Sequence, residues 1–94
     1  MIVVACTVHL HLPGVASLKE KRSRLKPLLT QLRRQFEIAA AEVDHHDVWQ
    51  SSDVALVTVA TEASHAYAVL ENAVHWMEDT WPQVEVTDWE TELR

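Results

Sequence analysis

An α+β fold, in which two helices cover one face of a four-stranded sheet, is predicted from three observations. Four segments have the apolar content or the two-residue alternation of strands, and two longer segments carry apolar residues at the three- and four-residue steps of helices. The order along the chain is strand, helix, strand, strand, helix, strand. The third observation is size: 94 residues, 48% of them hydrophobic, suit one two-layer core, so we expect a single domain over residues 1–94.

The first strand is predicted at residues 2–12, where apolar side chains alternate with Thr7, His9 and His11. Alternation places these three polar residues on the face of the sheet away from the helices. The single cysteine, Cys6, falls in the apolar set and is expected to be buried. One cysteine excludes an internal disulfide and a CxxC motif, in agreement with a reducing compartment.

The first helix is predicted from Ser17 to about Phe36. The sequence SLKE is a capping box, in which Ser17 caps the early amide groups and Glu20 reaches back to the cap residue. Leucines then recur at helical spacing up to Phe36. Pro27 removes one backbone hydrogen bond inside this segment and is expected to bend the helix or restart it.

The second and third strands are predicted at residues 37–44 and 53–61, and a second helix runs from Thr61, a candidate N-cap, until Pro82 ends it. Residues 84–93 alternate as a fourth strand. A right-handed crossover folds this order into a ferredoxin-like βαββαβ two-layer sandwich. Its sheet is mainly antiparallel, the first and third strands are central, and both helices lie on one face.

The open face of this sheet is a candidate binding surface. Strict alternation in the last strand places Trp89 beside Thr7, His9 and His11, where a partner subunit, a peptide or a stacked base could cover it. The alternative is a tryptophan tucked under the C-terminal tail. His9 and His11 could share a metal ion only with a third ligand, and the sequence contains no closed ligand set, so we expect no metal and no cofactor.

Charge is distributed unevenly along the chain. Residues 1–34 hold seven Lys or Arg and one acid, whereas residues 35–94 hold one Arg and thirteen acids, giving the net charge of −6. Overall acidity argues against indiscriminate nucleic-acid binding, but a basic face can still contact phosphate. On a helical wheel a basic stripe lies beside the buried face of the first helix and is a candidate site for RNA or a protein partner: Lys19, Arg22, Lys26 and Arg33. A solvated helix face is the alternative.

The segment AEVDHHDVWQ, residues 41–50, concentrates side chains that could carry acid–base chemistry. This loop constellation, of unassigned role, comprises Glu42, Asp44, His45, Asp47, Trp49 and Gln50. The chain lacks a serine nucleophile elbow, and its single glycine excludes a glycine-rich phosphate loop, so no catalytic residue is assigned. We expect the carboxylates to hydrogen-bond backbone amides and Trp49 to pack at the end of the sheet.

Two stretches, SLKEKRSRLK at residues 17–26 and AEVDHHDVWQ at residues 41–50, resemble motifs of the bacterial YlxP-like family, a domain of unknown function. The likeness covers essentially the whole chain and implies a ferredoxin-like fold. Genes of that family often lie among translation and ribosome-maturation genes, so the resemblance implies a cytoplasmic role linked to RNA. It implies no catalytic residue.

The leading hypothesis is therefore a small nonenzymatic module that associates with RNA or a ribosomal particle through the basic helix. A self-associating module, dimeric through the open sheet face or through opposed charges, is the second hypothesis. A metal-dependent or hydrolytic enzyme is the third. No hydrophobic run approaches the length of a membrane helix, so we expect no membrane partner and a cytoplasmic location.

Overall fold

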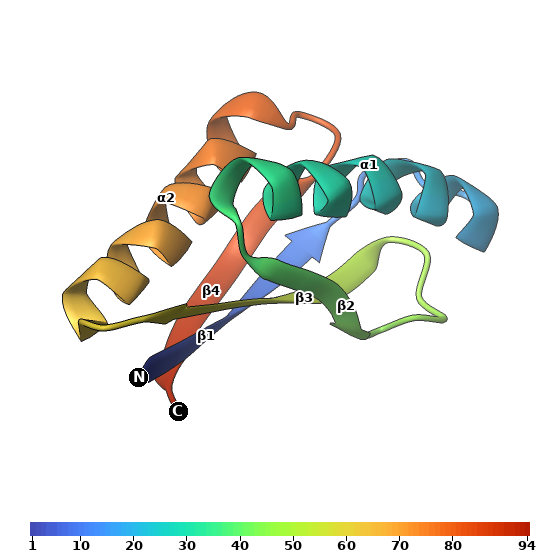
Figure 1. Ribbon diagram of the computed structural model, residues 1–94. Helices are drawn as coiled ribbons and strands as arrows, with labels where there is room; N and C mark the ends of the chain where they lie inside the picture. Colours follow the sequence, from blue (N-terminus) through green and yellow to red (C-terminus); the bar gives the residue numbers. More distant parts are fainter.

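The computed structural model describes residues 1–94 and confirms the ferredoxin-like βαββαβ order. Its elements are β1 (Ile2–His11), α1 (Leu18–Phe36), β2 (Ala39–Asp44), β3 (Ser51–Ala60), α2 (Ala63–Thr80) and β4 (Glu85–Leu93). The sheet has the order β2-β3-β1-β4 with every pair antiparallel, so β1 and β3 are central. Both helices lie on one face of the sheet, and the other face is open (Figure 1).

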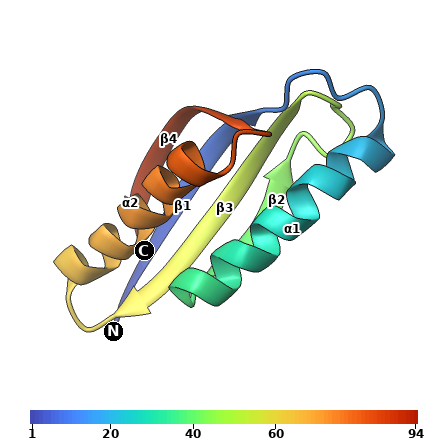
Figure 2. The ribbon, with the colours of Figure 1, turned by 90° about the horizontal axis from the view of Figure 1, so that it is seen from above.

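The view from above shows which loops share an end of the molecule (Figure 2). The chain leaves β1, crosses to the start of α1, and lies near the connection between β2 and β3 at the same end of the sheet. A backbone hydrogen bond joins two of these segments: the Leu12 amide donates to the Gln50 carbonyl at 3.0 Å. Segments distant in sequence are therefore neighbours here.

The start of α1 confirms the predicted cap with one change of partner. Ser17 accepts a hydrogen bond from the Glu20 amide at 3.1 Å, as a capping box requires. The Glu20 carboxylate reaches the amide of Ala16, at 3.0 Å, and not that of the cap residue. Of the two outcomes expected at Pro27, a bend or a restart, the restart is absent, since α1 continues through Pro27 as one helix.

Other boundaries also differ from the sequence prediction: β3, for example, begins at Ser51 rather than at residue 53. Strand β2 begins at Ala39 rather than at residue 37, because Glu37 is the C-cap of α1 and takes a left-handed conformation with φ of 53°. Thr61 is not the N-cap of α2: that position is Glu62, which makes no side-chain capping bond. Helix α2 is thus held by its apolar contacts, not by an N-terminal cap.

The core lies between the helices and one face of the sheet. It contains 19 buried apolar side chains, among them Cys6 and Leu10, whereas His9 and His11 point to the open face, as the alternation of β1 predicts. Burial raises the pKa of the Cys6 thiol to about 11, so this cysteine is a packed apolar residue and not a nucleophile.

Trp89 is the main correction to the predicted sheet. It pairs with Val8, on the helix-covered face, and its ring packs edge-on against His75 of α2 with centroids 6.3 Å apart. The cause is a β-bulge: His9 pairs with Asp88 but Leu10 with Val86. The extra residue reverses the alternation of β4 beyond it, so the prediction that places Trp89 on the open face is wrong.

Candidate functional site

The two sequence motifs, residues 17–26 and residues 41–50, meet at the end of the sheet where α1 begins. Lys21 of the first motif extends its ammonium to Glu42 of the second, with Nζ 2.8 Å from Oε2. The same ammonium donates to the backbone carbonyl of His45. A hydroxyl completes the group, because Ser52 donates to the same Glu42 oxygen at 2.6 Å. This motif junction consists of Lys21, Glu42, His45 and Ser52.

The ion pair at the motif junction is buried. Lys21 is only 1% exposed and Ser52 is fully buried, while the Glu42 side chain keeps 18% of its surface in contact with solvent. A buried ammonium is costly unless its hydrogen bonds are satisfied, and here a carboxylate and a carbonyl satisfy it. Lys21 therefore locks the β2–β3 connection onto α1 and is not free to bind a ligand.

Lys21 is the residue that sequence reasoning missed, although the wheel contains the signal. Counting from Leu18, Lys21 falls at about 300°, between Leu28 at about 280° and Leu32 at about 320°. It therefore lies within the apolar stripe, flanked by two leucines. A charged residue at such a position is buried together with a partner of opposite charge. The acids of the second motif were the candidates for that partner.

A β-bulge in β2 separates the carboxylates of the second motif. Residues two apart in a regular strand share a face, but the register shifts between Glu42 and Asp44. Glu42 consequently faces the helices, opposite Val54, and Asp44 faces the open side, opposite Asp53. The predicted loop constellation is thus divided between two faces of the sheet and does not form one site.

On the open face, His9 is placed between two carboxylates. Its Nδ1 lies 2.6 Å from Oδ1 of Asp53, and its Nε2 lies 3.6 Å from Oε1 of Glu90. The hydrogen bond to Asp53 raises the pKa of His9 above its ordinary value of 6.5, with Glu90 adding to the effect and partial desolvation opposing it. The histidine is therefore poised to carry a positive charge beside two acids.

His11 does not join His9 at a common point, because its Nδ1 lies 3.0 Å from the carbonyl of Gln50. A different set could hold a divalent cation: ligand atoms of Asp44, His45 and Asp53 all lie within 4.8 Å of one another. Asp44 and His45 are exposed. The expectation of no metal site stays a prediction.

The rest of the loop constellation is exposed to solvent. Trp49 is 50% exposed, so the expectation that it packs at the end of the sheet is wrong. The Asp44 carboxylate accepts a hydrogen bond from the His45 amide at 2.8 Å, as expected of an acid in a turn. Gln50 donates its side-chain amide to the Val15 carbonyl, which ties the loop to the start of α1. Asp47 is exposed and makes no hydrogen bond or ion pair.

The basic stripe of α1, comprising Lys19, Arg22, Lys26 and Arg33, lies in solvent as the wheel predicts. None of its four side chains forms an ion pair within the chain. Arg33 donates through Nε and one terminal nitrogen to the Ala40 carbonyl of edge strand β2, at 3.0 and 2.7 Å. Between the stripe and β2 lies a shallow depression of about 360 Å³ lined by Arg22, Leu25, Lys26, Leu29, Arg33 and Glu42.

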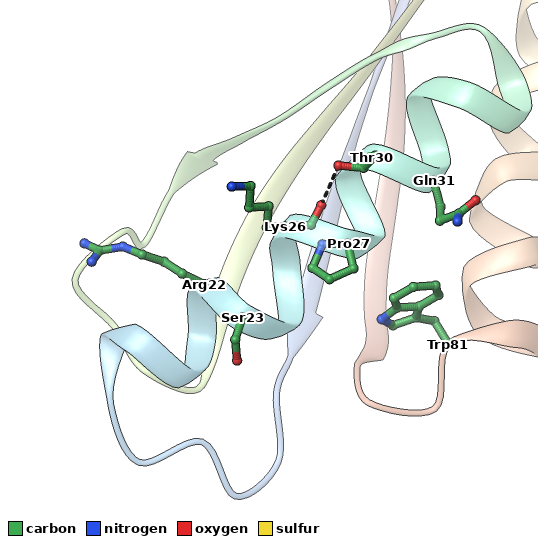
Figure 3. A pocket seen from close by; sticks show the side chains of 7 residues that line it. All are labelled: Arg22, Ser23, Lys26, Pro27, Thr30, Gln31 and Trp81. Carbon is green, nitrogen blue, oxygen red and sulfur yellow. Dashed lines mark hydrogen bonds between the residues drawn. The ribbon is translucent and has the colours of Figure 1, made fainter.

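A second depression lies on the other side of the stripe and has a volume of about 520 Å³. Most of its lining comes from successive turns of α1, and Trp81, at the end of α2, closes it (Figure 3). The sequence pattern alone does not single out Trp81 as a site residue. Its position beside the basic stripe depends on how the two helices pack, which no local pattern encodes.

Neither helix has both the length and the apolar composition that a membrane crossing requires.

Comparison with known proteins agrees with the fold and identifies the family. The structure superposes on a de novo designed protein with a ferredoxin fold, solved by NMR, with a TM-score of 0.61 and 10% identity over the whole of this chain and 84% of that one. The sequence is 30% identical over 76 residues to the uncharacterized protein YlxP of Bacillus subtilis (strain 168). The matched region covers 81% of this chain and 82% of the relative. The family model described as a protein of unknown function, DUF503, matches residues 3–91, and the chain therefore belongs to that family.

Proposed function

We propose that this protein is a nonenzymatic module that associates with RNA or a ribonucleoprotein through the basic stripe of α1. The observation that carries the proposal is a row of four exposed cations with no carboxylate partner in a chain whose net charge is −6. Fourteen acids are available to neutralise these side chains, yet the fold leaves the stripe unpaired. Phosphate groups at the helical spacing of the stripe would supply the missing anions.

The distribution of acids defines the direction from which RNA would approach. Four acidic residues of β4, Glu85, Asp88, Glu90 and Glu92, pair with open-face residues of β1 and lie on the sheet face away from the helices. A polyanion is repelled from that side and attracted to the helix side. The stripe runs from Lys19 to Arg33, a separation of fourteen residue steps that corresponds to about 21 Å of helix. This length accommodates several phosphates.

The direct test compares charge reversals on two flanks of α1. Arg22→Glu and Lys26→Glu should each weaken the binding of single-stranded RNA, and the double variant should abolish most of it. Arg34→Glu is the matched control, because Arg34 is exposed on the same helix but outside the stripe. Four phosphate contacts predict a slope of about −3 for the logarithm of affinity against the logarithm of salt concentration, falling to about −1.5 without two of them.

Two results would contradict the proposal. One is wild-type protein that binds neither RNA nor purified ribosomal particles at low salt in fluorescence anisotropy and co-sedimentation. The other is binding that Arg22→Glu and Arg34→Glu weaken equally, since that would reflect net charge and not the stripe. Crosslinking in the native cell, followed by identification of the attached RNA, would then name the target.

Self-association is a second candidate because the open sheet face contains an apolar patch. The patch joins three strands through neighbouring pairs and consists of Val3, Ala5, Ala39, Ala41, Ala55, Val57 and Val59. Val59 is 61% exposed. Contiguous exposed apolar surface is typical of interaction sites, so a second copy of the chain covering this face is a defined alternative.

A further inference from the structure

The depression between α1 and Trp81 differs from the rest of the surface in its chemistry. Its floor is the Pro27 ring and its far wall is the Trp81 indole, as the close view shows (Figure 3). Arg22 and Lys26 extend from the opposite rim, away from the indole. No acidic side chain lines it, although acids make up 14 of the 94 residues. The depression thus has a flat aromatic wall on one side and positively charged side chains at the rim on the other side.

Trp81 is held in place before any ligand arrives. Its backbone amide donates to the Met77 carbonyl at 3.0 Å, which closes the last turn of α2. Its indole packs against that of Trp76 with ring centroids 5.8 Å apart, and Trp76 in turn meets Phe36 of α1 edge-on, also at 5.8 Å. A ring held by an aromatic neighbour that is itself packed against the other helix loses little conformational entropy when a ligand stacks on it.

Polar groups suited to a nucleobase edge and to phosphate lie nearby. The Gln31 amide lines the depression and makes no hydrogen bond within the chain, so its donor and acceptor are both free. On the other flank of Pro27 and Trp81, a smaller depression of about 300 Å³ includes Arg24. The Arg24 guanidinium is fixed by donating to the carbonyls of Pro13 and Gln83 at 2.8 and 3.3 Å. Arg24 is also paired with the Glu20 carboxylate at 3.3 Å, so the unpaired cations beside the aromatic wall are Arg22 and Lys26.

We propose that this depression receives one unpaired nucleobase of single-stranded RNA, which stacks on Trp81 while neighbouring phosphates contact Arg22 and Lys26. The inference rests on the proposed RNA-binding function and adds the class of RNA to it. A base in a duplex is already stacked and paired, whereas an unpaired base exposes the ring face that an indole can cover. An acidic peptide would satisfy the cations but would leave the flat aromatic wall and the free amide without matched partners.

The first experiment varies the aromatic ring and keeps the charge. A fluorescein-labelled 12-nucleotide uridine RNA and a duplex of the same length are titrated with wild-type protein, Trp81→Ala and Trp81→Phe. Loss of one base-stacking contact should weaken single-strand binding by about 5- to 100-fold in Trp81→Ala, and Trp81→Phe should recover much of the loss. Trp49→Ala is the control, because that indole is half exposed on a loop outside the stripe. Circular dichroism confirms that each variant is folded.

The salt dependence distinguishes this inference from the proposed function. Trp81→Ala should lower affinity without changing the slope against salt, whereas Arg22→Glu should lower both. Strong binding of RNA that is unchanged in Trp81→Ala, or equal for duplex and single strand, would overturn the stacking site and leave the basic stripe intact. Displacement of RNA by polyglutamate as effectively as by unlabelled RNA would also overturn it, because charge alone would then explain recognition. Failure of every RNA to bind would overturn both.

Discussion

At the scale of single residues, Lys21 shows how a charged side chain can serve the fold and not the surface. It comes from the most basic segment of the chain and yet is withdrawn from the basic stripe, because its ammonium is shared between Glu42 and the carbonyl of His45. Pairing a buried charge gives little net stability relative to an apolar residue, but removing one partner leaves the other without compensation. The pair therefore specifies how the β2–β3 connection docks.

Replacing the buried lysine should test that role. Lys21→Met should lower the free energy of unfolding by about 3 kcal/mol in urea denaturation, because Glu42 and the His45 carbonyl lose their donor. Lys21→Met combined with Glu42→Leu should recover part of the loss, since no carboxylate then stays uncompensated. Lys19→Met, two residues earlier and exposed, should change stability by less than about 0.5 kcal/mol. A Lys21→Met protein as stable as the wild type would show that the pair contributes nothing.

The His9–Asp53 pair should make stability depend on pH. Its imidazole faces Asp53 from β3 and Glu90 from β4, and His45 also approaches Asp53, with Nε2 3.5 Å from Oδ2. Because the pKa of His9 is raised above 6.5 in the folded protein, the stabilisation is fully present below that pH and is lost as pH rises through the raised value. An NMR titration should show the His9 pKa falling towards 6.5 in Asp53→Asn. An unchanged His9 pKa in that variant would remove Asp53 as the cause.

At the scale of elements, the two helices begin differently, and the sequence predicts only one of these starts. Ser17 is a capping residue in a recognisable SLKE pattern, whereas Thr61 has the right chemistry one position too early. Ser17→Ala should therefore lower the free energy of unfolding by about 1 kcal/mol in urea denaturation. Thr61→Ala should change it by less than about 0.5 kcal/mol, because its side chain caps nothing. Equal effects of the two substitutions would contradict the assigned N-caps.

The strands show where sequence patterns fail. Alternation correctly predicts which residues of β1 face the helices. The pairing of β1 with β3 has no register shift along its whole length. It fails in β4 and β2, because each contains a bulge that reverses the faces of the residues beyond it. Trp89 thereby packs, partly buried, on the helix-covered face beside α2, and Glu42 is separated from Asp44. A bulge adds one residue without a distinctive sequence, so strict alternation could not reveal it.

At the scale of the whole molecule, local sequence patterns are sufficient to predict the order of the elements. They are not sufficient to predict the candidate site. Helical spacing in α1 was sufficient to predict the basic stripe, because the stripe belongs to one helix. The depression that joins this stripe to Trp81 requires the end of α2 to lie beside the middle of α1 (Figure 3). The motif junction likewise requires β2 to approach the start of α1. Contacts of this kind between distant elements depend on tertiary packing, which short sequence motifs do not predict.

The two faces of the molecule make opposite predictions about salt. RNA binding through the stripe weakens as salt rises, whereas association of two copies through the apolar patch is driven by burial and is nearly insensitive to screening.

If a second copy covers the patch, sedimentation equilibrium at micromolar concentration should show a dimer at both low and high salt. Val59→Glu should dissociate it, because a charge would be introduced into the apolar surface that the two sheets bury between them. Val48→Glu, on a loop outside the patch, should leave it intact. A wild-type protein that sediments as a monomer throughout would exclude the self-association candidate and leave the open face without a role in assembly.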